Sequence, residues 1–314
     1  MTDRIHRQRS CKAFSFLVLV AAARVHGLPP VTRTASSRLS HVVLAFHVKQ
    51  LDVARINLQS WERVPPCARQ LKHQKQNLRR RRLPTLTLYA ASDGGAPIQT
   101  VLASLDSLWS SSNYKHCFAG ATTRHLAIDN AIDNHRDGAR LMFENMLAGN
   151  VVDKASVVLY MEPDLRPVRP NWLEALERVS AAPGDPFWVK GSVFLGDAAL
   201  LAATNYLPNM YHINGNALYN VGDKDFVDFY SNRVRPYVER KHGDSVSAYD
   251  TDMYEFLMDR ANYDYARRVM HMYRYTGAIV NMWHTLYNID DVLKANADAV
   301  LVHGGGGRAV DDGR

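Results

Sequence analysis

Short apolar runs and helically spaced apolar residues alternate through the middle of the chain. The runs predict strands over Thr85–Ala90, His125–Ile128 and Val157–Met161. The periodic segments predict helices from Ile98 to Trp109 and from Asp137 to Leu147. Strands alternating with helices are typical of an α/β fold, so we expect a mostly parallel or mixed sheet flanked by helices.

Two carboxylates, Glu162 and Asp164, follow the most apolar of these runs on either side of Pro163. Acids are not tolerated inside a strand buried on both faces, so we expect them just past its carboxyl end. Open α/β sheets bind ligands in that crevice. Two oxygen donors there can hold a hard divalent cation, which can in turn hold a diphosphate. The alternative is an acidic turn that Pro163 begins.

Two further acids follow predicted strands. Asp93 lies in a glycine-rich turn after the first strand, and Asp129 follows the second. Each is a candidate contact for a nucleotide, and each is equally explained as a turn residue.

The next segment predicts a helix over Trp172–Val179 capped by Asn171, and a strand within Phe187–Ser192. After it, Asn214 and Asn216 flank a glycine between apolar runs. Their amides suit sugar hydroxyls, but Asn-Gly is also the commonest hairpin turn, and the dipeptide alone favours that turn.

Asp223–Tyr237 is amphipathic and predicts a helix, and Ala278–Met282 is a further short apolar segment. Asp250 is a natural N-cap for a helix over Met253–Asp259. Capping explains Asp250 well and Asp252 less fully. Asp252 lies near the positive end of that helix, where a carboxylate can serve as a catalytic base.

A last buried-type strand, Ala299–Val302, ends in His303, four glycines and Arg308. An imidazole at a strand end can ligate a metal, and an arginine can pair with phosphate oxygens. A glycine-rich tail with an incidental histidine explains the same residues.

The amino-terminal part has a different composition. The net charge of +7 gathers before residue 84, where Arg79–Arg82 is a run of four arginines. Residues 1–27 have a basic start and the apolar stretch Ala13–Ala23, which favours a signal peptide or a short signal anchor over an organelle-targeting peptide. We expect residues 28–83 to be a basic, mostly disordered stem with a helix near Val48–Trp61. A basic run of this kind is usually a solvated linker, so no nucleic-acid partner is expected.

The three cysteines, Cys11, Cys67 and Cys117, form no CxxC or zinc-type cluster. They signal neither a disulfide framework nor a structural zinc.

Taken together, the strand–turn–helix start, the acidic motif, the downstream acid and the final His-Gly resemble a GT-A-type glycosyltransferase over Thr85–Arg308. The resemblance implies a transferase domain over residues 84–310. It assigns Glu162, Asp164 and His303 to Mn²⁺ or Mg²⁺, and Asp93, Asp129 and Arg308 to the nucleotide. Asp252 resembles the base of inverting members. The sequence departs from the usual pattern in the glutamate of the acidic motif and in the missing lysine after His-Gly.

The resemblance implies transfer of a sugar from a nucleotide-diphosphate donor to a hydroxyl of a carbohydrate or glycoprotein acceptor. With the amino-terminal signal it implies an enzyme of the secretory pathway, in the Golgi lumen, anchored to the membrane through its amino terminus. Two alternatives stay open: a non-catalytic carbohydrate-binding or degenerate transferase fold, and a nucleotidyltransferase on a similar sheet.

Overall fold

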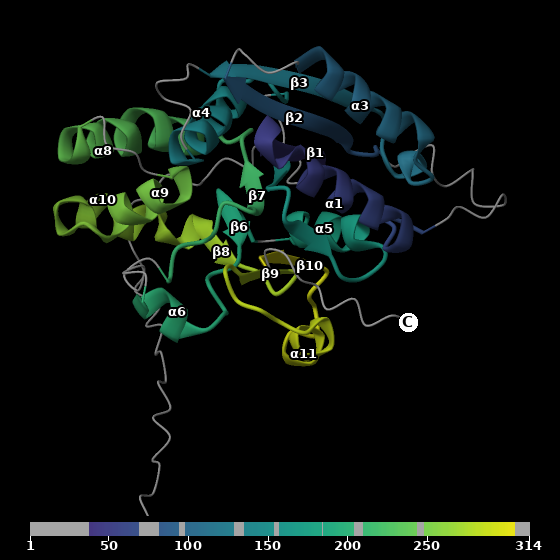
Figure 1. The fold of residues 1–314 in the computed structure, drawn as a ribbon. Helices are drawn as coiled ribbons and strands as arrows, with labels where there is room; N and C mark the ends of the chain where they lie inside the picture. Colours follow the sequence, from purple (N-terminus) through teal and green to yellow (C-terminus); the bar gives the residue numbers. More distant parts are fainter. Residues whose placement is uncertain are drawn as a thin grey trace, which may run out of the picture. The chain divides into compact units, whose positions relative to one another are not determined.

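The computed structural model describes residues 38–68, 82–93, 98–128, 135–153, 157–183, 185–203, 210–243 and 248–304. All of them belong to one unit, residues 35–314. Figure 1 shows their helices arranged around a central sheet.

Seven strands form the main sheet in the order β3-β2-β1-β4-β7-β6-β8. Strands β3, β2, β1 and β4 run parallel to one another, whereas β7 is antiparallel to both β4 and β6. A second sheet has the order β5-β10-β9. The strands are β1 (Leu39–His47), β2 (Thr85–Asp93), β3 (Ala121–Ile128), β4 (Val157–Met161), β5 (Leu165–Pro167), β6 (Val189–Gly191), β7 (Ala217–Asn220), β8 (Tyr273–Tyr275), β9 (Ile279–Met282) and β10 (Leu301–Gly304).

Helices separate most of these strands along the chain. The α-helices are α1 (Leu51–Arg63), α3 (Ile98–Ser111), α4 (His135–Leu147), α5 (Trp172–Ser180), α6 (Ala198–Ala203), α7 (Lys224–Asp228), α8 (Arg235–His242), α9 (Tyr249–Met258), α10 (Tyr263–Val269) and α11 (Ile289–Ala295). Short 3₁₀ turns are η1 (Val48–Gln50), η3 (Lys115–Cys117), η6 (Arg260–Asn262) and η7 (Met270–Met272), and η5 (Phe229–Val234) is a π-helical turn.

The central strands are buried on both faces, as their continuous apolar runs predict. In β1, Val42 and Leu44 face one core with α1, α3 and α5, whereas Val43 and Ala45 face another with α4 and α9. Figure 1 shows these two groups of helices on opposite sides of the sheet. The expected α/β fold, a mostly parallel and mixed sheet flanked by helices, is confirmed.

The expected stem over residues 28–83 is wrong for much of its length. Strand β1 is an interior strand of the sheet, paired with β2 on one side and β4 on the other. The predicted helix near Val48–Trp61 is present as α1. The run Val42–Phe46 buries apolar side chains on both faces of the sheet. This burial favours a strand, even though the residues around the run are polar and basic. The folded domain therefore begins before Thr85.

The expectation that the cysteines signal no disulfide is also wrong. Cys67 and Cys117 form a disulfide across 50 residues of sequence. Cys67 follows α1 and Cys117 ends η3, so their proximity depends on the packing of α1 beside α3. Sequence spacing alone does not reveal such a pair. Cys11 lies outside the described residues.

Within the described part of the chain, none of the helices has both the length and the apolar character needed to cross a membrane.

Candidate functional site

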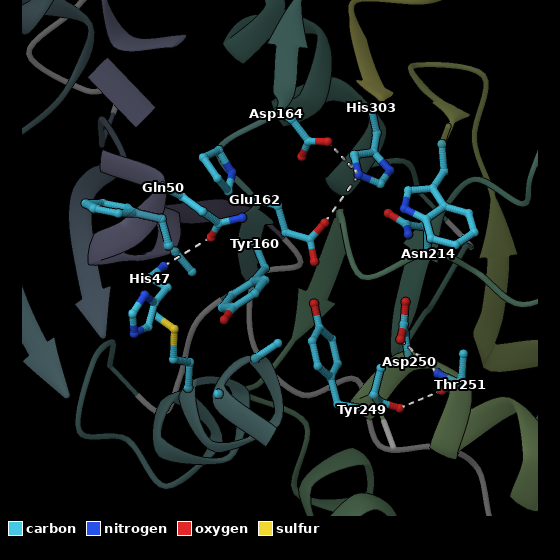
Figure 2. Close-up of a pocket in the computed structure, with 18 of the residues that line it drawn as sticks. His47, Gln50, Tyr160, Glu162, Asp164, Asn214, Tyr249, Asp250, Thr251 and His303 are labelled. Atoms are coloured by element: carbon cyan, nitrogen blue, oxygen red, sulfur yellow. Dashed lines mark hydrogen bonds and ion pairs between the residues drawn. The ribbon is translucent and has the colours of Figure 1, made fainter. Parts of the chain in front are cut away.

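A cavity of about 520 Å³ opens at the carboxyl ends of β1, β2 and β4. Figure 2 shows side chains from several distant segments directed into it. The polar side chains among its described lining are His47, Lys49, Gln50, Tyr160, Glu162, Asp164, His212, Asn214, Tyr249, Asp250, Thr251, Asn281 and His303. The cavity therefore occupies the crevice in which open α/β sheets bind ligands.

Glu162, Asp164 and His303 meet in the wall of this cavity. The Nε2 atom of His303 lies 3.3 Å from Glu162 Oε2 and 3.3 Å from Asp164 Oδ2. The chain brings them together through the second sheet, because β10 pairs antiparallel with β5 and sets His303 opposite Leu165. One ligand atom from each of the three residues lies within 4.8 Å of the others, close enough to hold a metal ion.

The glycine after His303 fixes the local backbone. Gly304 has a φ of 103°, in the left-handed region that favours glycine. A Cβ at this position would lie 2.5 Å from the carbonyl oxygen of Met282. The His-Gly pair is therefore part of a close contact between β10 and β9, and His303 belongs to the strand instead of following it.

The cluster has strongly coupled charges. Burial alone would lower the pKa of His303, but the carboxylates of Asp164 and Glu162 raise it to about 10. Burial would raise the pKa of Asp164, but His303 beside it holds that pKa below its ordinary value. Without a cation, His303 is therefore an imidazolium at neutral pH. The proton on its Nε2 atom faces both Glu162 and Asp164.

Asn216 orients the first acid. Its Oδ1 accepts a hydrogen bond of 2.7 Å from the Glu162 backbone N–H, and its Nδ2 donates one of 2.8 Å to Glu162 Oε2. The hairpin turn favoured for this segment is not formed, because Asn216 precedes β7 and β7 pairs with β4 and β6. Asn214 lies in the cavity wall, where its Oδ1 accepts a hydrogen bond from Asn216.

Helix α1 holds the second acid in place. The buried Nδ2 group of Asn57 donates to the carbonyl oxygens of Pro163 and Leu165, at 3.1 and 2.7 Å. These two carbonyls flank Asp164, so the segment expected to be a stem supports the turn that carries a site residue.

Asp250 faces the cavity from the first turn of α9. Ala248 is the N-cap residue of this helix, so the predicted capping role of Asp250 is wrong. Asp250 Oδ2 accepts a hydrogen bond of 2.7 Å from the Gly215 N–H and lies 3.3 Å from His212 Nε2. Gly215 is required here, because a Cβ would overlap the Tyr249 hydroxyl. Burial would raise the pKa of Asp250, but His212 and the backbone N–H donors hold it below its ordinary value.

Asp252 does not line the cavity. It is fully buried, and its Oδ2 accepts a hydrogen bond of 2.9 Å from Arg235 on α8. Arg235 also lies 3.0 Å from Glu144 on α4. Residues two positions apart on a helix face different directions, so Asp250 reaches the cavity while Asp252 joins α4, α8 and α9.

The predicted nucleotide contacts are less completely described. Asp93 ends β2, the strand that contributes Ala91 to the cavity. Asp129 and Arg308 lie outside the described residues. The end of β1 contributes His47, and η1 contributes Lys49 and Gln50, and the sequence analysis missed all three. The signal for them was the apolar run of β1 followed by polar residues, and the basic surroundings concealed it.

The sequence and the fold were compared with those of known proteins. No family model and no curated protein matches the chain. The galactosyltransferase LgtC, in complex with donor and acceptor sugar analogues, is 14% identical with a TM-score of 0.45, covering 85% of this chain and 87% of its own. Mouse xyloside xylosyltransferase 1 is 12% identical with a TM-score of 0.46, covering 85% of this chain and 98% of its own. The bifunctional glycosyltransferase WbbM is 12% identical with a TM-score of 0.47, covering 90% of this chain and 47% of its own. Likenesses at this level define neither an activity nor a substrate for this chain.

Proposed function

We propose that the protein is a metal-dependent glycosyltransferase that moves a sugar from a nucleotide-diphosphate donor to an acceptor hydroxyl. One observation carries the proposal. Glu162, Asp164 and His303 come together in the wall of a cavity of about 520 Å³, at the carboxyl ends of parallel strands. This volume is typical of a small-molecule site.

The residues of the cluster fit a divalent cation. Two carboxylates and one imidazole leave further coordination positions open for phosphate oxygens. The side chains of Glu162 and Asp164 are 34% and 31% exposed, and both line the cavity. The imidazole nitrogen favours Mn²⁺ over Mg²⁺, which prefers oxygen ligands. When bound, the cation would supply positive charge that stabilises a departing diphosphate.

The remaining polar residues of the cavity suit a sugar nucleotide. Asp250, His212 and Asn214 offer hydrogen-bond partners for sugar hydroxyls. His47 and Lys49 line the part of the wall at the end of β1, where a cationic side chain favours an anionic donor. These placements support a donor bound between the end of β1 and the start of α9.

In the proposed reaction the acceptor hydroxyl oxygen bonds to the anomeric carbon of the donor. The bond from that carbon to the diphosphate oxygen breaks, and its electron pair leaves with the nucleoside diphosphate. The hydroxyl proton leaves to a base. Asp252 lies in a buried ion pair away from the cavity, so we propose Asp250 as the carboxylate that contacts substrate.

The experiment is a panel of nucleotide-sugars incubated with the protein and Mn²⁺, with nucleoside diphosphate release measured. We expect release with at least one donor, loss of release in chelator, and loss in the His303→Gln variant. Pyrophosphate release instead would favour a nucleotidyltransferase. Donor binding without any turnover would favour a non-catalytic fold.

We also propose that the protein enters the secretory pathway and works in the Golgi lumen. The disulfide between Cys67 and Cys117 supports this proposal, because disulfides persist in oxidising compartments. The apolar stretch Ala13–Ala23 is the segment that would direct entry and anchor the chain. A reporter fused to residues 1–27 should reach the endoplasmic reticulum, and a cytosolic, mitochondrial or plastid reporter would contradict the proposal.

A further inference from the structure

Asn281 lies beside His303 in the second sheet. The two residues are register partners in the parallel strands β9 and β10, and each is 2% exposed. Asn281 Oδ1 lies 3.1 Å from His303 Nδ1. Asn281 therefore contacts the ring nitrogen that faces away from the two acids.

A second hydrogen bond fixes the orientation of the Asn281 amide. Its Oδ1 also accepts a hydrogen bond of 3.1 Å from the Trp283 backbone N–H. A backbone N–H can only donate, so the atom it contacts must be the oxygen of the amide and not the nitrogen. An amide oxygen can only accept, and the Nδ1 atom of His303 must therefore carry a hydrogen.

The consequence concerns the other ring nitrogen. Because Nδ1 keeps its hydrogen, Nε2 is the nitrogen that would give up its proton and offer its lone pair to a cation. Nε2 lies 3.3 Å from both Glu162 Oε2 and Asp164 Oδ2, so it faces the place where a cation would lie. The amide of Asn281 selects the tautomer and holds the ring plane toward the acids.

We propose that Asn281 is the positioning residue of the cation site, which acts through His303 by fixing its tautomer and ring orientation. The inference rests on the proposed metal-dependent function. Hydrogen-bond partners of metal-ligating histidines commonly change metal affinity by about 10–100-fold when they are removed.

The test is Mn²⁺ binding to the full chain without nucleotide, measured by electron paramagnetic resonance. Asn281→Ala removes the acceptor, whereas Asn281→Asp keeps an oxygen for both His303 Nδ1 and the Trp283 N–H. We expect weaker Mn²⁺ binding by about 10–100-fold in Asn281→Ala. The Asn281→Asp variant should bind Mn²⁺ with an affinity close to that of the wild-type protein.

A matched control is Ser192→Ala. The buried Ser192 hydroxyl accepts a hydrogen bond of 3.4 Å from the Asn281 backbone N–H but contacts no proposed ligand. It should leave Mn²⁺ affinity unchanged. Spin-echo spectra of protein labelled with ¹⁵N-histidine add a direct readout. The coupling of Mn²⁺ to nitrogen should be present in the unchanged protein, absent in His303→Gln and reduced in Asn281→Ala.

The outcomes separate this inference from the proposed function. Unchanged Mn²⁺ affinity and nitrogen coupling in a folded Asn281→Ala variant would overturn the role of Asn281 alone, provided that His303→Gln still weakens binding. Equal losses in Asn281→Ala, Asn281→Asp and Ser192→Ala would overturn it in favour of general support of the fold. If the unchanged protein binds no Mn²⁺, the cation site itself fails, and the inference fails with it.

Discussion

The side-chain amide of Asn57 donates a hydrogen bond of 2.7 Å to the carbonyl oxygen of Leu165, across 108 residues of sequence. The same amide group reaches the carbonyl of Pro163, and Asn57 Oδ1 accepts a hydrogen bond from Trp61 Nε1. One buried side chain thus satisfies three polar groups around the turn that carries Asp164.

Asn57→Ala should lower the free energy of unfolding by about 1–3 kcal/mol, because it leaves buried carbonyls and the Trp61 N–H without partners. It should also weaken Mn²⁺ binding, since Asp164 loses its backbone support. Urea unfolding and Mn²⁺ titration measure the two effects. Gln59→Ala, an exposed amide on the same helix, is the control and should change neither quantity. Equal effects of the two substitutions would contradict the supporting role of Asn57.

Removing the segment before Thr85 should destroy the fold. A chain beginning at residue 84 lacks β1, which lies between β2 and β4, so the main sheet would lose its continuity. A chain beginning at residue 38 keeps every described strand. Circular dichroism with thermal melting should show a cooperative transition for the longer chain only. A cooperative transition in the shorter chain would mean that β1 is dispensable.

Asp250 and Asp252 should behave differently on substitution by asparagine. Asp250→Asn should lower turnover by about 10–100-fold, the cost of losing one charged hydrogen bond to substrate, with little change in Mn²⁺ affinity. Asp252→Asn should instead destabilise the protein, since Arg235 loses a buried partner, by at most about 3–5 kcal/mol. Donor turnover and urea unfolding distinguish the two effects. A stable Asp252→Asn variant without turnover would restore Asp252 as the base.

The free energy of unfolding of the metal-free protein should fall as the pH rises above neutral. The folded pKa of His303, about 10, exceeds its ordinary value of 6.5 because of Asp164 and Glu162. The folded state therefore retains a proton that the unfolded state releases, so the stabilisation is complete below 6.5 and is lost as the pH rises towards 10. Urea unfolding in chelator between these limits measures the slope. His303→Gln should show a flatter profile, and an identical slope in both proteins would refute the charge pairing.

The disulfide should contribute to stability. Cys117→Ser should lower the free energy of unfolding by about 2–4 kcal/mol, because the unfolded chain gains freedom when the loop is opened. Cys11→Ser, which leaves this bridge intact, should have no such effect. Unfolding curves of the wild-type protein and the two variants under non-reducing conditions measure these differences in the free energy of unfolding.

The local pattern of apolar and polar residues was enough to predict a strand or helix wherever the composition of the segment matches its burial in the fold. Val157–Met161 is a strand with the predicted bounds, and the placement of Glu162 just beyond it followed from the exclusion of acids from a buried strand. Strand β1 was missed because the basic residues around it suggested a solvated segment, whereas burial on both faces decides its structure.

Relations between distant residues could not be predicted in this way. The distinction between Asp250 and Asp252 depends on the rotation of α9 relative to the sheet, which two acids separated by one residue in a sequence do not reveal. The roles of Asn216 and Asn281 depend on strand pairing, because each amide reaches its partner across neighbouring strands. Their residue type alone is equally typical of turns.

The bridge between Cys67 and Cys117 also determines how the chain would respond to proteolysis. Residues 69–81 lie between the two cysteines, so a single cut there leaves the two fragments covalently joined. The smaller fragment would carry β1 and α1, and therefore an interior strand of the sheet together with Asn57. A protein cleaved in this segment would migrate as one species without reductant and as two with it, and its cavity would keep the walls contributed by both fragments.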